Sequence, residues 1–147
     1  MLVEILEELL NRDLNKLKLE IESYQNETLI WAVDKNITNS AGNLCLHIVG
    51  NLNTYIGAVI GNTGYVRNRD AEFSLKNVSR TELLGQIDNV ISVINRSLVN
   101  LTQEDLDKEY ALQVFKEKTT TSYFLIHLTT HLAYHLGQVN YHRRLLD

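Results

Sequence analysis

The sequence predicts an all-α fold, and its composition and hydrophobic spacing carry that prediction. The 147 residues contain no proline and only seven glycines, so little in the chain interrupts long helices. Hydrophobic residues make up 44 % of the chain, and in four stretches they recur every three or four positions, the spacing of one buried helix face. Four such helices in a chain of this length predict a four-helix bundle, with residues 1–147 as one domain.

The first half of the chain is predicted to form two helices joined by an irregular stretch. Residues 3–24 hold an apolar stripe on one side and charged side chains on the others, which predicts an amphipathic helix. A second helix is predicted over residues 41–60, where either Asn39 or Ser40 can cap the first turn. The stretch between the two helices loses the helical pattern, and we expect Trp31 to close one end of the core.

The second half contains two more helices and two segments without a helical period. Residues 61–75 are predicted to be a structured loop, after which a capping box at 79–82 begins the third helix. The polar segment 102–120 has alternating apolar residues in its middle, as in a short strand or an extended crossing segment. The last helix covers residues 121–146. The extended pieces before the second and last helices leave room for a long crossover, whose handedness the sequence does not fix.

Charge, cysteine content and the N-terminal residues exclude several classes of protein. The net charge is −4, and no basic stripe is present that could neutralise the phosphates of a nucleic acid. The N-terminal residues carry acidic side chains inside an apolar period, unlike a signal peptide, and polar residues in the second helix argue against a membrane span. The single cysteine, Cys45, forms no internal disulfide and is expected to be a small core residue. These features predict a cytoplasmic protein.

Four of the five histidines lie in the last predicted helix, beside its apolar stripe. His131 and His135 are one turn apart, so their Cβ atoms lie about 5–6 Å from each other, and two imidazoles at that distance can share a metal ion. The fifth histidine, His47, lies in the second helix and could supply a third ligand. Single histidines are also common at helix borders without binding any metal. This alternative suits His47 taken alone better than it suits the pair His131 and His135.

Two stretches of the chain resemble a known family: HLAYHLGQ at residues 131–138 and NSAGNLCLHIVGNLNTYIGAVIGNTGYVRNRDAEF at residues 39–73. Together with the helix layout they resemble the DinB-like superfamily, specifically its branch with a G-Y-V-R-N-R-D loop. That superfamily is similar to metal-dependent thiol S-transferases that use bacillithiol, mycothiol or glutathione. The resemblance implies a divalent metal held by the following residues: His47, His131 and His135. The other two histidines of the last helix, His127 and His142, match no ligand position of the family.

Three neutral imidazoles leave a divalent ion with its positive charge. That charge can lower the pKa of a bound water or thiol toward neutral pH. Zinc suits such a site, and nickel or another first-row ion is compatible with the same ligands. By helical spacing, three residues can accept hydrogen bonds from the outer imidazole nitrogens, although each can equally be a packing residue: Asn51, Tyr134 and Gln138.

The loop that follows the second helix carries two arginines with two competing roles. Arg67 and Arg69 could bind an acidic thiol cofactor or substrate above the metal, because guanidinium groups recognise carboxylate and phosphate. They could instead pair with Asp70 and Glu72 and fix the loop.

The function expected from these features is that of a metal-dependent enzyme of the thiol S-transferase or hydrolase type acting on a small molecule. Its divalent metal would activate a low-molecular-weight thiol or a water molecule. The alternative is a non-catalytic metal-binding or stress-related binding protein, because no general base other than a histidine can be placed at the site.

The distribution of charge predicts a homodimer. Residues 36–66 and 119–142 contain no Asp, Glu, Lys or Arg, whereas the first and third helices are rich in charge. The outward side of the second helix is expected to carry three glycines, which cost stability in a helix unless another helix approaches closely: Gly50, Gly57 and Gly61. We therefore expect a two-fold homodimer through the second and last helices, with Tyr134 and Tyr141 near its edge.

Overall fold

The computed structural model describes residues 1–147 and contains helices but no β-strand, which confirms the all-α prediction. Four helices are long: α1 (Leu2–Ser23), α2 (Ala41–Leu52), α4 (Arg80–Leu98) and α6 (Thr121–Leu146). Two short α-helices, a 3₁₀-helix and a π-helical segment join them: η1 (Glu27–Trp31), η2 (Asn53–Ala58), α3 (Arg69–Ser74) and α5 (Gln103–Asp107). No helix of the protein has the length and apolarity needed to cross a membrane.

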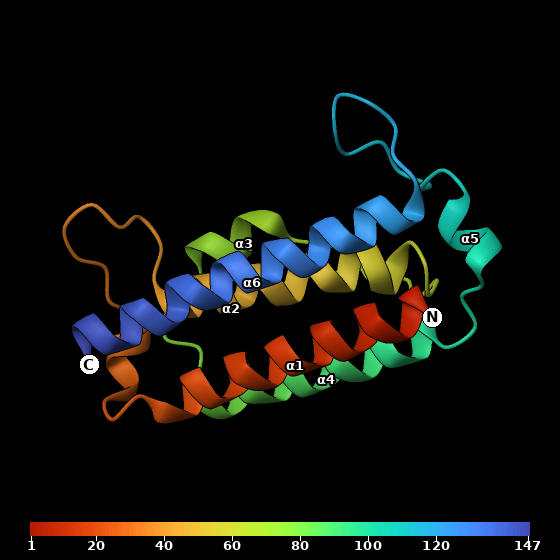
Figure 1. Ribbon diagram of the computed structural model, residues 1–147. Helices are drawn as coiled ribbons and strands as arrows, with labels where there is room; N and C mark the ends of the chain where they lie inside the picture. The colour runs from red at the N-terminus through yellow and green to blue at the C-terminus, as the bar shows by residue number, and fades with distance from the viewer.

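The four long helices lie side by side around one core (Figure 1). Both α1 and α2 pack against α4 and α6, so each long helix has two long neighbours. In Figure 1, α1 and α6 run in one direction and α2 and α4 in the other. The segment between α2 and α4 must therefore return along the molecule, and it carries α3. The sequence had left room for a return before the second and last long helices, whereas Figure 1 shows this one after α2.

The core is one cluster of 29 buried hydrophobic residues, to which all four long helices contribute. Trp31 belongs to this cluster, and its ring packs so closely on α2 that a Cβ at Gly42 would lie 2.7 Å from ring atoms. Truncating an aliphatic side chain of such a core to alanine costs about 2–5 kcal/mol.

The helix starts agree with the caps expected from the sequence. Of the two candidates for the cap of α2, the structure selects Ser40, whose Oγ accepts a hydrogen bond from the backbone N–H of Asn43 at 3.1 Å. Ser79 caps α4 in the same way by accepting from Glu82 N at 3.2 Å. The reciprocal half of the expected capping box is absent, because the Glu82 carboxylate accepts from Gln86 instead.

The second predicted helix changes geometry before its expected end. After Leu52 the backbone continues as the π-helical segment η2, in which residues donate to carbonyls five positions back, as Gly61 N does to Ile56 O. Thr54 lies at this transition and its hydroxyl donates to Gly50 O at 2.7 Å. A threonine hydroxyl that donates to the preceding turn disturbs the regular α-helix. The wider π-helical turn that follows accommodates one extra residue.

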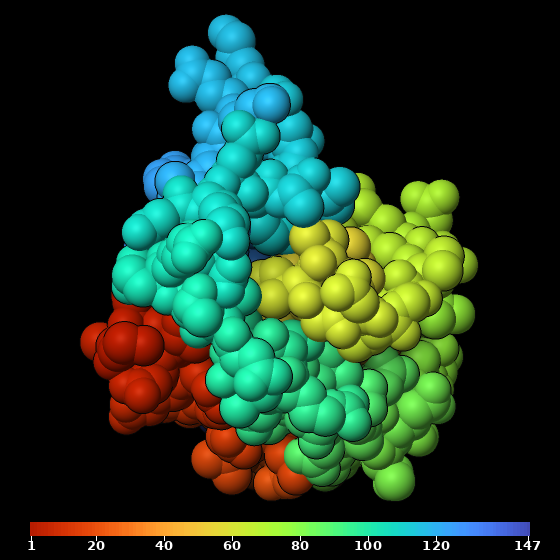
Figure 2. All heavy atoms as spheres, turned by 90° about the vertical axis from the view of Figure 1, so that its right-hand side faces the viewer, coloured from red at the N-terminus to blue at the C-terminus, as the bar shows by residue number.

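Two segments expected to lack helix contain short ones. The end of the predicted loop 61–75 forms α3, and the start of the polar segment 102–120 forms α5. The remainder of that second segment forms a single bridge between Glu109 and Thr120, and no strand. It stands out from the end of the molecule at which α6 begins (Figure 2). Of its three alternating apolar residues only Tyr110 is buried, since Leu112 is 47 % and Val114 43 % exposed.

The close approach that the three glycines of the second predicted helix require is made inside the chain. Every residue of α2 is buried, so this helix has no outward face. A Cβ added at Gly50 would meet α3, and one added at Gly57 or Gly61 would meet α4 or its C-terminal end. The glycines therefore give no argument for a partner helix, and the expectation that α2 offers an outer face to a second copy was wrong.

Candidate metal centre

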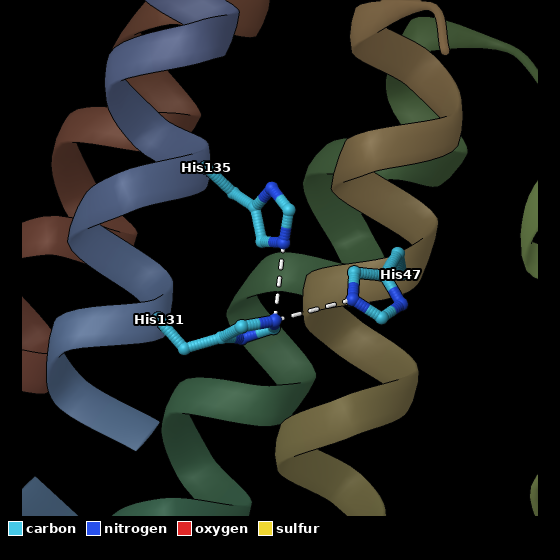
Figure 3. A group of neighbouring side chains, drawn as sticks. All are labelled: His47, His131 and His135. Carbon is cyan, nitrogen blue, oxygen red and sulfur yellow. Dashed lines mark hydrogen bonds between the residues drawn. The ribbon is translucent and has the colours of Figure 1, made fainter. Parts of the chain in front are cut away.

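Three imidazoles meet between α2 and α6, the two helices that carry the expected metal ligands (Figure 3). His47 extends from α2, and His131 and His135 extend from successive turns of α6. The Nε2 atom of His131 lies 3.4 Å from that of His47 and 3.0 Å from that of His135. One ligand atom from each ring lies within 4.8 Å of the others, so the trio could hold a metal ion.

Two of the three rings are oriented by acceptors on their outer nitrogens. The Nδ1–H of His47 donates to Glu72 Oε1 at 3.1 Å, and the Nδ1–H of His135 donates to Gln138 Oε1 at 2.7 Å. A neutral imidazole with its hydrogen on Nδ1 has a lone pair on Nε2. Both rings therefore present an electron pair at the point where the trio converges.

The sequence had not indicated that Glu72 bonds to a histidine of this site. Its side chain belongs to α3 and is buried, and it also accepts from Arg67 Nε at 2.8 Å and from Arg67 Nη2 at 2.9 Å. It fits because Gly50 has no side chain, since a Cβ there would lie 2.0 Å from Glu72 Oε2. Asn43 Nδ2 fastens the same turn by donating to Glu72 O at 2.9 Å.

Burial favours the neutral form of two of the three histidines, His47 and His131. It lowers the pKa of His47, although the hydrogen bond to Glu72 acts in the opposite direction. Burial, together with positive charge on His135 and His47, lowers the pKa of His131 to about 4. Neutral imidazoles are the form that binds metal, so neither ring has to lose a proton near pH 7.

Two other residues expected around the metal do not bond to an imidazole nitrogen. Tyr134 is 67 % exposed, and its ring meets only the edge of the His135 ring, with 5.4 Å between centroids. Asn51 is buried, but its Oδ1 has no hydrogen-bond partner. Of the three candidates, Gln138 alone accepts from a histidine of the trio.

The two arginines have different surroundings. Arg67 forms the pair with Glu72 that had been considered as its alternative role, and its Nη2 lies 3.4 Å from His47 Nδ1. Arg69 is exposed, and its guanidinium lies over the ring of Phe73 at 5.3 Å rather than beside a carboxylate.

The remaining histidines and the cysteine lie outside the trio. His142 is buried between helices, where its Nδ1 accepts from the Tyr24 hydroxyl at 2.6 Å and its Nε2–H donates to a backbone carbonyl at 2.8 Å. The His127 ring packs edge-on against Phe115, with 4.8 Å between centroids. Cys45 is fully buried, and burial raises the pKa of its thiol to about 12, as suits a core residue.

The comparison with known proteins identifies a family. The chain matches a family model over residues 3–147, a range that includes every helix of the fold except the first residue of α1, and all three histidines of the trio. A search of curated proteins gives no match. Because the family match spans almost the whole chain, the protein belongs to the family described as "Protein of unknown function (DUF1572)".

Proposed function

We propose that this protein is a metal-dependent enzyme of the thiol S-transferase or hydrolase type, with a divalent ion held by His47, His131 and His135. The convergence of the three Nε2 atoms carries the proposal. Ligand nitrogens on a tetrahedral ion with bonds of about 2.0–2.1 Å lie about 3.3 Å apart. That value is close to the two Nε2 separations of 3.0 and 3.4 Å.

The donor set and its surroundings fit zinc or nickel. Imidazole nitrogen binds both ions, and two rings have their Nδ1 hydrogens held by other side chains. When bound, such an ion would supply a positive centre that lowers the pKa of a thiol or of water. The chain's own contribution is to hold the rings in place: Glu72 and Arg67 fix His47, and Gln138 fixes His135.

The resemblance to the DinB-like superfamily also leads us to propose a fold, a cellular location and a substrate class. The four long helices, each packed on two others, and the returning segment with α3 support a single-domain, DinB-like four-helix bundle with a long crossover. We further propose a cytoplasmic location, a low-molecular-weight thiol as co-substrate and a small molecule as the electrophile. The lone buried cysteine and the absence of a basic stripe support this setting over a nucleic-acid partner.

Elemental analysis tests the metal centre. The purified protein should contain close to one divalent ion per chain, and His131→Ala or His135→Ala should remove it. His127→Ala is the matched control, because it removes an imidazole from the same helix outside the trio. Full metal retention in the His131→Ala protein would remove the basis of the proposal.

A kinetic assay separates the enzyme from a binding protein. Zinc-loaded and nickel-loaded protein would be mixed with a panel of small thiols and an electrophile whose reaction with the thiol is followed by absorbance. Metal-dependent turnover that disappears in the His131→Ala protein is the expected result. Metal binding without turnover across the panel would favour the non-catalytic metal-binding or stress-related protein.

A further inference from the structure

A cleft of about 450 Å³ lies between α4 and the part of the chain where α2 passes into η2. The residue of α2 in its lining is Val49, which follows His47 by two positions and therefore lies about 200° around the helix from it. No histidine of the trio lines this cleft. A cleft of this size can hold a small organic molecule, and a ligand here would be separate from the proposed metal centre.

Asn53 contributes a buried polar group to this cleft. The residue is 6 % exposed, and its side chain forms no hydrogen bond within the protein, although nearly all buried polar side chains have a partner. The buried side-chain atoms that lack a partner and are sealed from solvent all belong to other residues. The amide of Asn53 is therefore accessible, and it is accessible from the cleft that it lines. It offers a donor and an acceptor to a molecule bound there.

Gly85 keeps one wall of the cleft open. It lies inside α4, where a glycine costs stability relative to alanine. A Cβ at this position would have no neighbouring atom within 4 Å, so no packing contact requires the glycine. Because Gly85 belongs to the lining, a side chain at this position would take up space in the cleft.

Most other polar groups of the lining are uncharged. Gln86 and Asn89 of α4 carry amides, and Tyr65, between η2 and α3, carries a hydroxyl. The Asn89 amide and the Tyr65 hydroxyl form no hydrogen bond within the protein, and Gln86 forms one long bond of 3.4 Å to Glu82. Amides and hydroxyls both donate and accept, as the hydroxyls of a ligand do. This lining therefore favours a molecule with several hydroxyl groups.

Glu82 is the only charged residue of the lining. Its carboxylate has no Lys or Arg nitrogen within 4.0 Å. Arg67 is close to Tyr65 along the chain, but its guanidinium is bonded to Glu72. The cleft thus carries one negative charge without a cation, which favours a positively charged ligand. An ammonium group suits it, since its three N–H donors can reach a carboxylate and neighbouring amide oxygens.

We infer that this cleft binds a small hydroxylated amine, with its ammonium group at Glu82 and its hydroxyls at the amides of Asn53 and Asn89. The cleft is then a second small-molecule site, on another side of α2 from the histidine trio. Binding there requires no metal.

NMR titration of isotope-labelled protein in phosphate buffer tests the class of ligand. Three six-carbon polyols that differ in charge serve as probes: the cation glucamine, neutral sorbitol and the anion gluconate. Glucamine should shift the side-chain amide signals of Asn53, Gln86 and Asn89. Sorbitol should bind about three- to fivefold more weakly, since a charge pair at an exposed carboxylate contributes little, and gluconate should bind more weakly still. Hexylamine has the charge but no hydroxyls, and it should also bind more weakly than glucamine.

Two substitutions with matched controls test the two sides of the ligand. Glu82→Gln should make the affinities for glucamine and sorbitol equal, whereas Glu117→Gln, which removes an exposed carboxylate outside the cleft, should change neither. Gly85→Leu should abolish binding of both probes by filling the cleft, and it should raise the melting temperature because leucine favours a helix over glycine. Gly137→Leu, at the other helical glycine with open space, should also raise the melting temperature but retain binding.

These results separate the cleft from the proposed function. Glucamine should bind metal-free His131→Ala protein as it binds wild type, so the cleft site survives a failure of the metal centre. Lost binding in that variant would place the ligand at the trio and overturn the inference. Equal wild-type affinities for glucamine and sorbitol, unmoved Asn53 amide signals, or full glucamine affinity in Gly85→Leu protein would overturn it as well.

Discussion

At the scale of single residues, Glu72 joins the histidine trio to the rest of the protein. Its buried carboxylate accepts one hydrogen bond from His47 and two from Arg67. Removing it would leave an imidazole N–H and a guanidinium without their partner inside the protein. We therefore expect Glu72→Ala to weaken metal binding about 10–100-fold, the usual effect of losing such a partner. Competition with a chromophoric chelator would measure this change.

The amide variant distinguishes positioning from packing. Glu72→Gln keeps the size of the side chain and one oxygen that can accept from His47, so it should restore part of the metal affinity lost in Glu72→Ala. The free energy of unfolding, measured with urea on metal-free protein, should fall by about 3–5 kcal/mol in the alanine variant because a buried ion pair is broken. Equal metal affinities for wild type and Glu72→Ala would exclude a positioning role.

His131 predicts a pH dependence of the metal-free protein. Its pKa is about 4 in the folded chain against an ordinary value of 6.5, so the unfolded chain takes up the proton first as pH falls. Stability should therefore be full above about pH 6.5 and decrease between there and pH 4. The lowered pKa of His47 acts in the same direction.

Urea unfolding with a chelator present, at several pH values across that range, would measure the effect. His131→Gln should show a smaller loss of stability on acidification than wild type, because one of the two histidines with a lowered pKa is absent. Parallel curves for the two proteins would show that His131 does not contribute.

At the scale of elements, the contact between α2 and α3 depends on a glycine. Alanine normally stabilises a helix by about 1 kcal/mol over glycine. Gly50→Ala should nevertheless destabilise the protein and weaken its metal binding, because the added Cβ would lie 2.0 Å from Glu72 Oε2. Gly137→Ala is the matched control in α6, where the space is open, and it should raise stability slightly. Thermal unfolding of both variants would test the contrast, and a stabilised Gly50→Ala protein would contradict it.

The elements that could be predicted from the sequence are those with a sustained helical period. The last helix was expected at 121–146 and is found at Thr121–Leu146, because its apolar stripe and the Thr120 cap are both local signals. By contrast, α3 has six residues, too few for a period, and is held by Asn68 at its start and by contacts with α2.

The presence or absence of a periodic signal also explains which parts of the site could be predicted from the sequence. The spacing of His131 and His135 follows from helix geometry, and the resemblance to a family indicated His47 as their partner. The role of Glu72 depends on how a returning segment packs on α2, and that packing leaves no periodic signal in the sequence. Only the possible pairing of Arg67 with Glu72 was visible beforehand.

At the scale of the whole molecule, the exposed side of α6 is the surface best suited to a second copy. Residues 119–142 contain no charged side chain, and five large hydrophobic or aromatic residues of α6 are exposed: Tyr123, Ile126, Tyr134, Tyr141 and Leu145. Large exposed hydrophobic side chains gathered on one helix, most of them in a stretch without charge, are typical of an interface. We therefore retain the prediction of a two-fold homodimer but assign its contact to α6 alone, since α2 is covered by α3 and α4.

Sedimentation at micromolar concentration tests the dimer. Wild type should have about twice the chain mass of 16.9 kDa. Ala133 is exposed on α6, so Ala133→Arg should give monomers with an unchanged helical circular dichroism spectrum, because a charge placed in an apolar contact has no partner. Gln113→Arg adds the same charge on the exposed segment before α6 and should leave the dimer intact. A monomeric wild type, or an Ala133→Arg protein that keeps the double mass, would show that α6 is not the interface.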